Sequence, residues 1–239
     1  DEAFQTIKGE GFEVQFDMQQ GTINKLVYGG ESVIVPGYGP RLNAFRAFVS
    51  NDNWCYQPWF ANGLHNLKHR AENAQVIKEK NGNVKITCTV VSQAPNAARL
   101  QSKNGRYDSG IHTLEENTDR PLGPDDFKFT TNQIWTIYPD GSIELQAAIT
   151  SNNPGIVLAR LGYEMGVPAQ YDRFAYYGRG PVDNYNDRKT GQFIEQFSST
   201  VAEQFTNWPK PQQMGNHEET RWTSLSNAKG KGILVVNEK

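Results

Sequence analysis

Short stretches of alternating apolar and polar residues constrain the fold of this 239-residue chain more than any other feature. One stretch runs from Phe12 to Phe16, and a second runs from Thr22 to Tyr28 after a polar segment that ends in Gly21. Alternation with a period of two places every second side chain on the same face of a strand, so that one face can be buried. The two stretches therefore predict an antiparallel hairpin.

A second hairpin is predicted around the segment Pro139–Gly141, which reads Pro-Asp-Gly. Proline presets the first turn position and glycine accepts a left-handed backbone, as a tight turn requires. The flanking stretches, Phe127–Tyr138 and Ser142–Ile149, supply the two strands.

Another turn signal, Asn81-Gly82, precedes the β-branched stretch Val84–Val91. Helix signals are weak, and only Pro58–Leu64 is predicted to form a short helical turn. The polar segment Ala94–Gly123 is predicted to be a long loop, which in a compact domain is often functional or mobile. Further strands are predicted at Ser32–Val35, Ala159–Val167, Arg173–Tyr177, Phe193–Phe197, Arg221–Leu225 and Gly232–Val236.

These patterns predict an all-β fold, in which residues 1–239 form a single large antiparallel β-sandwich domain. A composition of 37% hydrophobic and 11% aromatic residues excludes an intrinsically disordered or collagen-like chain. The apolar run Gly232–Val236 ends three residues before the last residue, where a sandwich strand ordinarily needs a partner. We therefore expect the domain to be truncated at its C-terminal end; the alternative is that this strand ends the fold at a sheet edge.

The charge balance excludes some classes of partner. With 24 Lys and Arg against 26 Asp and Glu, the net charge is −2, which gives no electrostatic reason to expect a nucleic acid or an anionic membrane. No stretch approaches the roughly 18 apolar residues that can span a bilayer. We expect a soluble protein, cytoplasmic or periplasmic, and the sequence does not decide between these compartments.

Most residue patterns that carry catalysis or bind metals are missing. Cys55 and Cys88 form no metal or redox motif, and two cysteines exclude a disulfide scaffold. His65 and His69 stand four apart, but no glutamate adjoins His65 and the region is predicted as a loop, so no metal site is predicted. Neither a serine nucleophile elbow nor a phosphate-binding loop is present. No two of the 26 acidic residues stand out as a glycosidase pair, so no catalytic residue is predicted.

The densest group of polar residues lies between Tyr176 and Arg188, where Gly178, Gly180 and Pro181 predict a tight, irregular backbone. Aromatic, amide, carboxylate and guanidinium groups together suit sugar recognition, in which rings stack on C–H surfaces and polar groups bond to hydroxyls. The alternative is that the charged side chains pair with one another and brace a long loop. The candidates for contact with a ligand or a neighbouring domain are Arg179, Asn184, Tyr185, Asp187 and Arg188.

A second group of polar and aromatic residues lies between Phe45 and Trp54. Its polar members, Asn51, Asp52 and Asn53, can satisfy the local backbone in Asx turns. The functional alternative is a polar loop beside an aromatic wall. The residues of that wall would be Trp54, Tyr56 and Trp59.

A third group runs from Gly215 to Trp222 and contains His217, Glu218 and Glu219. On an extended chain, His217 and Glu219 would point to the same side and Glu218 to the other. His217 with a neighbouring carboxylate could act as an acid/base pair; the alternative is that these are surface residues at the start of a strand. His217 and Glu218 are also candidates for contact with a ligand or a neighbouring domain.

The segment Tyr177–Gly191, which reads YGRGPVDNYNDRKTG, resembles the signature Gly-x-Gly-Pro-x-Glu-Asn-Tyr-x-Asp-Arg of the C-terminal, or small-chain, domain (domain 5) of the large β-galactosidases of glycoside hydrolase family 2. Two other segments resemble family motifs: Phe45–Ala47 with Asn51-Asp52, and Pro209–Trp222. The order and spacing agree across roughly residues 10–239, which is nearly the whole chain.

This resemblance implies the large antiparallel β-supersandwich that galactose mutarotases also use. It implies a parent enzyme that hydrolyses terminal β-D-galactosides with retention, through two glutamates in an upstream TIM-barrel domain. The Mg and Na sites of the family also lie upstream, so no cofactor is expected here. The family implies that this domain packs on the barrel, contributes to the rim of the active site, and belongs to a homo-oligomer.

Two segments depart from the family pattern: Asp183 stands where a glutamate is usual, and Phe48–Ser50 replaces a Pro-Thr-Asp run. The first functional hypothesis is thus an accessory domain that has no hydrolytic activity alone. The second is a stand-alone carbohydrate-binding module built on the aromatic wall. The third, by analogy of fold only, is an aldose epimerase that uses His217 and Glu219.

Overall fold

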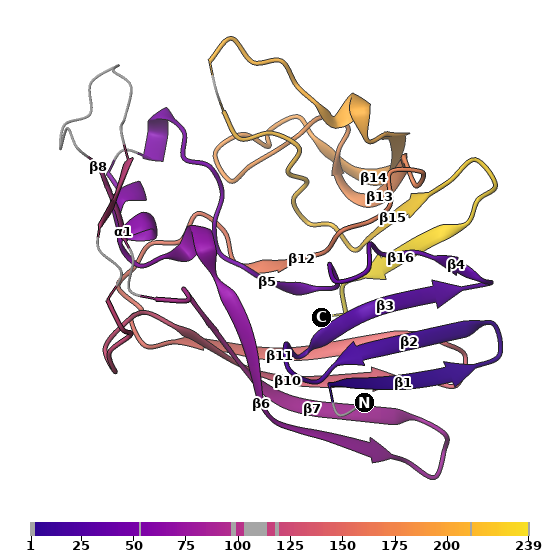
Figure 1. Cartoon of the computed structure of the whole chain (residues 1–239). Coiled ribbons are helices and arrows are strands. Elements are labelled where there is room, and N and C mark those ends of the chain that lie inside the picture. The colour runs from indigo at the N-terminus through magenta and orange to yellow at the C-terminus, as the bar shows by residue number, and fades with distance from the viewer. Residues whose placement is uncertain are drawn as a thin grey trace. The chain divides into compact units, whose positions relative to one another are not determined.

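The computed structural model describes residues 3–52, 54–96, 99–102, 114–117, 120–210 and 212–238. The chain divides into two compact units, residues 1–166 and 167–239. Antiparallel sheets dominate both units (Figure 1), so the predicted all-β sandwich class is confirmed. The assignment of the whole chain to one domain stays a prediction.

The first sheet of unit 1 follows from the first predicted hairpin. Its strands, in the order β1-β2-β3-β4, are β1 (Phe4–Gly9), β2 (Phe12–Asp17), β3 (Thr22–Tyr28) and β4 (Glu31–Ser32). The Asp17 carboxylate closes the turn between β2 and β3, because it accepts hydrogen bonds from the backbone N–H groups of Gln19 (2.8 Å) and Gln20 (2.9 Å). The predicted strand Ser32–Val35 is wrong beyond Ser32, since the regular pairing ends there.

The second sheet of unit 1 has the order β11-β10-β7-β6. Its strands are β6 (Lys68–Lys78), β7 (Val84–Gln93), β10 (Phe129–Ile137) and β11 (Ile143–Ser151). The β10–β11 hairpin and β7 were predicted, and β6 and β1 were not. The two sheets share a core, in which the rings of Phe16 (β2) and Trp135 (β10) meet edge to face at 5.7 Å.

A smaller part of unit 1 pairs β5 (Arg41–Asn43) with β12 (Gly162–Glu164). The predicted helical turn at Pro58–Leu64 is present as α1 (Tyr56–Ala61), followed by a 3-10 turn at Leu64–Asn66. A core forms around α1 from Leu42, Ala44, Cys55, Tyr56, Trp59, Phe60, Leu64, Phe127 and Phe129. Of the predicted strand Ala159–Val167, only the three residues of β12 are paired as a strand.

The predicted loop Ala94–Gly123 contains a short hairpin of β8 (Arg99–Ser102) and β9 (Leu114–Asn117), so that part of the prediction is wrong. Residues 97–98, 103–113 and 118–119 of this segment lie outside the described residues.

Unit 2 is built on one sheet with the order β14-β13-β15-β16. Its strands are β13 (Arg173–Gly180), β14 (Phe193–Thr200), β15 (Trp222–Ser226) and β16 (Gly232–Val236). All four were predicted, but the irregular backbone expected at Gly178–Gly180 is wrong. Strand β13 continues through Gly180, and the regular pairing ends at the cis bond between Gly180 and Pro181.

One face of this sheet carries exposed apolar side chains. Tyr177, Trp222 and Val236 are register partners across β13, β15 and β16, so their side chains share a face. Leu234 lies two residues from Val236 on the same side. Tyr177 is 39% exposed, Leu234 61% and Val236 56%, and we refer to these four residues as the Tyr177 face.

Candidate functional site

The structure brings two of the predicted polar clusters together at one place in unit 2. Asn184 is fully buried, and its amide nitrogen donates hydrogen bonds to the carbonyl oxygens of Arg179 (2.8 Å) and Val182 (3.0 Å). Its amide oxygen accepts a hydrogen bond from the backbone N–H of Glu218 at 2.7 Å. One side chain thus ties the loop after β13 to a segment more than thirty residues further along the chain.

Asn216 completes this connection from the other side. Its amide nitrogen donates to the Asn184 carbonyl oxygen (2.7 Å), and its own carbonyl oxygen accepts from the Asn184 N–H (2.8 Å). We call the region formed by residues 179–188 and 216–221 the Asn184 junction. Because buried amide groups are costly when unpaired, these bonds fix the relative position of the two segments.

An ion pair and two aromatic rings hold Arg188 in the junction. Its guanidinium donates to the Asp183 carboxylate at 2.9 Å, and the Asp183 side chain is only 5% exposed. The guanidinium carbon also lies over the rings of Trp208 (4.5 Å) and Tyr185 (5.2 Å). Asp183, which replaces the usual glutamate of the family signature, is therefore long enough to pair with Arg188.

Two further ion pairs connect residues 179–189 with the 216–221 segment. Arg179 donates to the Gln192 carbonyl oxygen at 3.1 Å and forms an ion pair with the Glu219 carboxylate. Lys189 pairs with Glu218 at 2.9 Å. Glu219 has a positive φ of 55° in a turn, so the alternation expected of an extended chain at residues 217–219 is wrong.

His217 is partly buried in the junction, and both of its ring nitrogens contact other residues. Its Nδ1 lies 3.2 Å from the Arg179 carbonyl oxygen and its Nε2 lies 2.6 Å from Oε1 of Gln204. Its ring lies 4.1 Å from the ring of Tyr176. Burial lowers the pKa of His217, and the hydrogen bond to Arg179 and the charge of Asp183 oppose this shift only in part.

The outer side of the junction is formed by residues without such partners. Asp187 and Asn186 are exposed, and neither makes a side-chain hydrogen bond to another described residue. Val182 is 56% exposed. Of the predicted site residues, Asn184 and His217 face inward, Arg179, Arg188 and Glu218 are paired, Tyr185 is partly buried, and Asp187 faces outward.

The second predicted cluster lies in unit 1. Asp52 is 8% exposed, receives two hydrogen bonds from Arg46 (2.5 and 2.8 Å), and accepts the backbone N–H of Val49 at 2.7 Å. These bonds fit the alternative in which Asp52 satisfies the local backbone. Asn53 lies outside the described residues.

The three residues of the predicted aromatic wall do not share one exposed face. Tyr56 and Trp59 are 2% and 1% exposed, and the Trp59 indole N–H donates to the Val157 carbonyl oxygen at 2.7 Å inside the core. Trp54 is 74% exposed. The wall prediction is therefore wrong for Tyr56 and Trp59, because the short helix α1 turns both inward.

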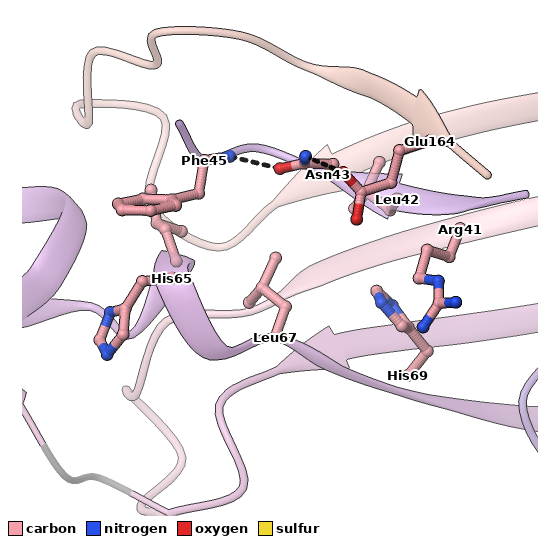
Figure 2. A pocket seen from close by; sticks show the side chains of 9 residues that line it. Arg41, Leu42, Asn43, Phe45, His65, Leu67, His69 and Glu164 are labelled. Carbon is pink, nitrogen blue, oxygen red and sulfur yellow. Dashed lines mark hydrogen bonds between the residues drawn. The ribbon is translucent and has the colours of Figure 1, made fainter. Parts of the chain in front are cut away.

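A pocket that the sequence did not predict lies in unit 1 (Figure 2). Its volume is about 300 Å³, and we call it the Glu164 pocket. Burial, with the charges of Arg41 and Lys68, lowers the pKa of His69 in this pocket to about 4. Its lining residues are Arg41, Leu42, Asn43, Phe45, Leu64, His65, Leu67, His69 and Glu164.

Within the part of the chain that the structure describes, no group of three or more His, Cys, Asp or Glu side chains is placed to hold a metal ion. Cys55 and Cys88 are buried free thiols, and burial raises the pKa of both, that of Cys88 to about 11. Thiols with a raised pKa are poor nucleophiles at neutral pH. None of the described helices has the length and apolar character needed to cross a membrane.

Sequence comparisons identify relatives of this chain. Beta-galactosidase of Priestia megaterium is 26% identical over 230 residues, which cover 96% of this chain and 19% of that protein. Beta-galactosidase of Halalkalibacterium halodurans is 27% identical, with 97% of this chain and 20% of that protein covered. Beta-galactosidase of Kluyveromyces lactis is 22% identical, with 98% and 20% covered.

The chain thus spans about a fifth of the length of these curated relatives. Residues 8–237 match the family described as "Beta galactosidase small chain". Because that match covers nearly all 239 residues, the chain belongs to the beta-galactosidase small chain family.

Proposed function

We propose that this chain acts as an accessory domain of a β-galactosidase that hydrolyses terminal β-D-galactosides, and that it has no hydrolytic activity alone. The observation that carries the proposal is the match of residues 8–237 to the small-chain family, in relatives of which the chain covers about a fifth. The rest of the parent polypeptide would supply the catalytic TIM barrel.

The ion pairs of the Asn184 junction support the proposal that the chain alone has no hydrolytic activity. A retaining glycosidase needs two carboxyl groups about 5–5.5 Å apart on either side of the scissile bond. Here each of three carboxylates is neutralised by its own cation: Asp183 by Arg188, Glu218 by Lys189 and Glu219 by Arg179. Carboxylates held in this way brace the loop and are poorly placed to attack a sugar.

The junction would then position an outer surface at the rim of the galactose site. Asn184, Arg188 and His217 would not contact the substrate themselves. They would hold the backbone of the loop that presents this surface. Asp187 is the candidate for contact with the substrate or the barrel, because it is exposed and carries an unpaired carboxylate among the described residues.

The Tyr177 face would dock the catalytic part of the parent polypeptide. Soluble proteins rarely leave several large apolar side chains together on a surface unless a partner covers them. The partner that we propose is the remainder of the parent polypeptide, since the chain covers only about a fifth of its relatives.

The finer features of the parent are part of the same proposal. They are hydrolysis with retention through two upstream glutamates, Mg and Na bound in the catalytic domain, and assembly as a homo-oligomer, with no nucleic acid or membrane as partner.

We do not extend the proposal to a binding module built on the aromatic wall, because Tyr56 and Trp59 are buried. Nor do we extend it to an epimerase that uses His217, since both of its ring nitrogens contact other residues.

A complementation assay tests the proposal. The 239-residue chain and the remaining part of the parent polypeptide are produced separately and assayed with a chromogenic β-galactoside. We expect no hydrolysis by the chain alone and restored hydrolysis when the two parts are mixed. Turnover by the chain alone at enzymatic rates, or a catalytic part that needs no small chain, would contradict it.

The role of Asp187 is tested in the same assay. We expect Asp187→Ala to lower kcat/KM of the complemented enzyme at least tenfold, without weakening assembly measured by size-exclusion chromatography. Asp172→Ala is the matched control, because Asp172 is an exposed aspartate of unit 2 outside the junction. Equal activity of the two variants would remove Asp187 from the rim.

A further inference from the structure

The Glu164 pocket is formed by three segments of unit 1 that are far apart in the sequence. Strand β5 supplies one wall, the end of β12 supplies Glu164, and the 3-10 turn Leu64–Asn66 with the start of β6 supplies the opposite wall (Figure 2). A volume of about 300 Å³ lies at the lower limit of pockets that bind small organic molecules.

One end of the pocket carries polar groups that are already oriented. Arg41 and Glu164 are register partners of β5 and β12. Asn43 donates from its amide nitrogen to Glu164, and its amide oxygen accepts the backbone N–H of Phe45 at 2.7 Å. The Arg41 guanidinium lies 4.6 Å from the centre of the Tyr38 ring. These contacts fix the side chains before any ligand arrives, which reduces the entropy cost of binding.

The same groups keep unused hydrogen-bonding capacity. Among the described residues, the only hydrogen bond of the Arg41 side chain is the one that it donates to the Gly37 carbonyl oxygen (3.1 Å), although a guanidinium has five N–H donors. Glu164 accepts a hydrogen bond only from Asn43 in this part of the chain, which leaves one carboxylate oxygen available. His69 uses Nδ1 in a bond with Ser92 Oγ at 2.9 Å and keeps Nε2.

Among the residues that line the polar end, the charges nearly cancel at neutral pH, and the Lys68 charge that acts on His69 lies outside the lining. Arg41 and Glu164 carry opposite charges, and the pKa of about 4 keeps His69 neutral. A strongly anionic ligand would meet the Glu164 carboxylate, and a cation would meet the Arg41 guanidinium. The pocket therefore favours an uncharged ligand that can both donate and accept hydrogen bonds.

The other end of the pocket is apolar and aromatic (Figure 2). The ring of Phe45 is held by edge contacts with Phe60 (5.3 Å) and His65 (6.0 Å). Leu42, Leu64 and Leu67 add apolar side chains to the lining of the pocket. A ligand that fills the pocket must therefore combine hydroxyl groups on one side with C–H groups on the other.

From this combination we propose that the Glu164 pocket binds a free monosaccharide, with hydroxyl groups on Arg41, Glu164 and His69 and the C–H face of the sugar ring against Phe45. The site goes beyond the accessory role proposed above, because its residues belong to unit 1 and none of them belongs to the Asn184 junction.

Titration of the 239-residue chain with D-galactose, followed by NMR of the histidine ring protons, tests this proposal. We expect saturable shifts of the His69 resonances with a Kd of about 1 mM, the strength of a few hydrogen bonds and one stacked face. Glu164→Gln and Arg41→Met should each raise the Kd at least tenfold. The matched controls Glu10→Gln and Arg173→Met change exposed residues away from the pocket and should leave the Kd unchanged.

Several outcomes would overturn the proposal. They are the absence of saturable binding at tens of millimolar galactose, equal affinity in the pocket and control variants, and tighter binding of the anionic sugar D-galacturonate than of D-galactose. Thermal melting of each variant shows that a lost affinity does not reflect unfolding. A negative result leaves the complementation assay unaffected, and failed complementation leaves this titration unaffected, so the two proposals fail independently.

Discussion

At the scale of single residues, the Asn184 junction shows that polar residues of a family motif can stabilise the fold rather than contact a ligand. The residue types between Tyr176 and Arg188 suited either sugar contact or internal bracing, and sequence could not decide between them. Which role each residue has depends on whether its side chain contacts the backbone of residues 216–221. Tertiary packing, which the sequence pattern does not show, brings these two segments together. Asn184 and Asp183 are braces because both are buried against partners from the junction.

Replacement of Asn184 measures the value of this brace. Asn184→Ala leaves the carbonyl oxygens of Arg179 and Val182 and the N–H of Glu218 without their partner. Since a buried unpaired polar group costs about 1–3 kcal/mol, we expect the free energy of unfolding to fall by about 3 kcal/mol or more, measured by urea denaturation. Asn186→Ala is the control at an exposed position and should change it by less than about 0.5 kcal/mol. A similar small effect at Asn184 would contradict the bracing role.

His69 provides a residue-scale prediction about pH. Its ordinary pKa of 6.5 is lowered to about 4 in the folded chain. As the pH falls below 6.5, the unfolded chain takes up a proton that folded His69 does not accept until about pH 4. The free energy of unfolding should therefore fall across this window, and the contribution of His69 should level off below it.

The His69 prediction is checked by NMR titration of the imidazole ring and by urea denaturation at several pH values. We expect a titration midpoint near pH 4 and a shallower loss of stability in His69→Gln than in the unsubstituted chain. A midpoint at or above the ordinary value would show that the histidine is not desolvated.

At the scale of secondary-structure elements, alternation located the strands that have one buried face. β2, β7 and β10 each place buried residues at every second position, so their pattern is visible in the sequence. β6 was missed because none of its residues is fully buried and its ladder is interrupted by an irregularity between Glu72 and Gln75. β5 was missed because it is only three residues long and too short to show a period, and β12, also three residues long, was predicted over the wider range Ala159–Val167. The Glu164 pocket was missed because it depends on the pairing of these two strands, which are far apart in the sequence.

Gly178 in β13 allows the segment 216–221 to pass close to this strand. A Cβ atom at Gly178 would lie 2.8 Å from the Cα atom of Thr220. The backbone of Thr220 can therefore come this close to β13 only because residue 178 has no side chain. We expect Gly178→Ala to lower the free energy of unfolding by about 1–3 kcal/mol through this steric overlap. Gly162→Ala is the matched control in β12, where no atom lies within 4 Å of the added Cβ, and should be neutral or slightly stabilising. Equal effects would mean that the crossing segment moves aside at no cost.

At the scale of the whole molecule, the family match and the Tyr177 face lead to one expectation about assembly. The junction is built from parts of the two segments Tyr177–Gly191 and Pro209–Trp222, and the sheet that carries the junction also presents Leu234 and Val236 to solvent. Full burial of an exposed aliphatic side chain contributes about 1.5–3 kcal/mol, so covering the exposed parts of Leu234 (61%) and Val236 (56%) would favour association with the rest of the proposed parent polypeptide.

Lysine substitutions on this face separate docking from folding. We expect Leu234→Lys and Val236→Lys to weaken association with the catalytic part at least tenfold, since a charge buried in an apolar interface is strongly unfavourable. The exposed positions should tolerate the change in the chain alone, with the free energy of unfolding altered by less than about 0.5 kcal/mol. Ile77→Lys, on the exposed part of β6 in unit 1, is the control and should leave association unchanged. Association is measured by size-exclusion chromatography of the mixed parts, and unimpaired binding by both lysine variants would show that another surface of the chain makes the contact.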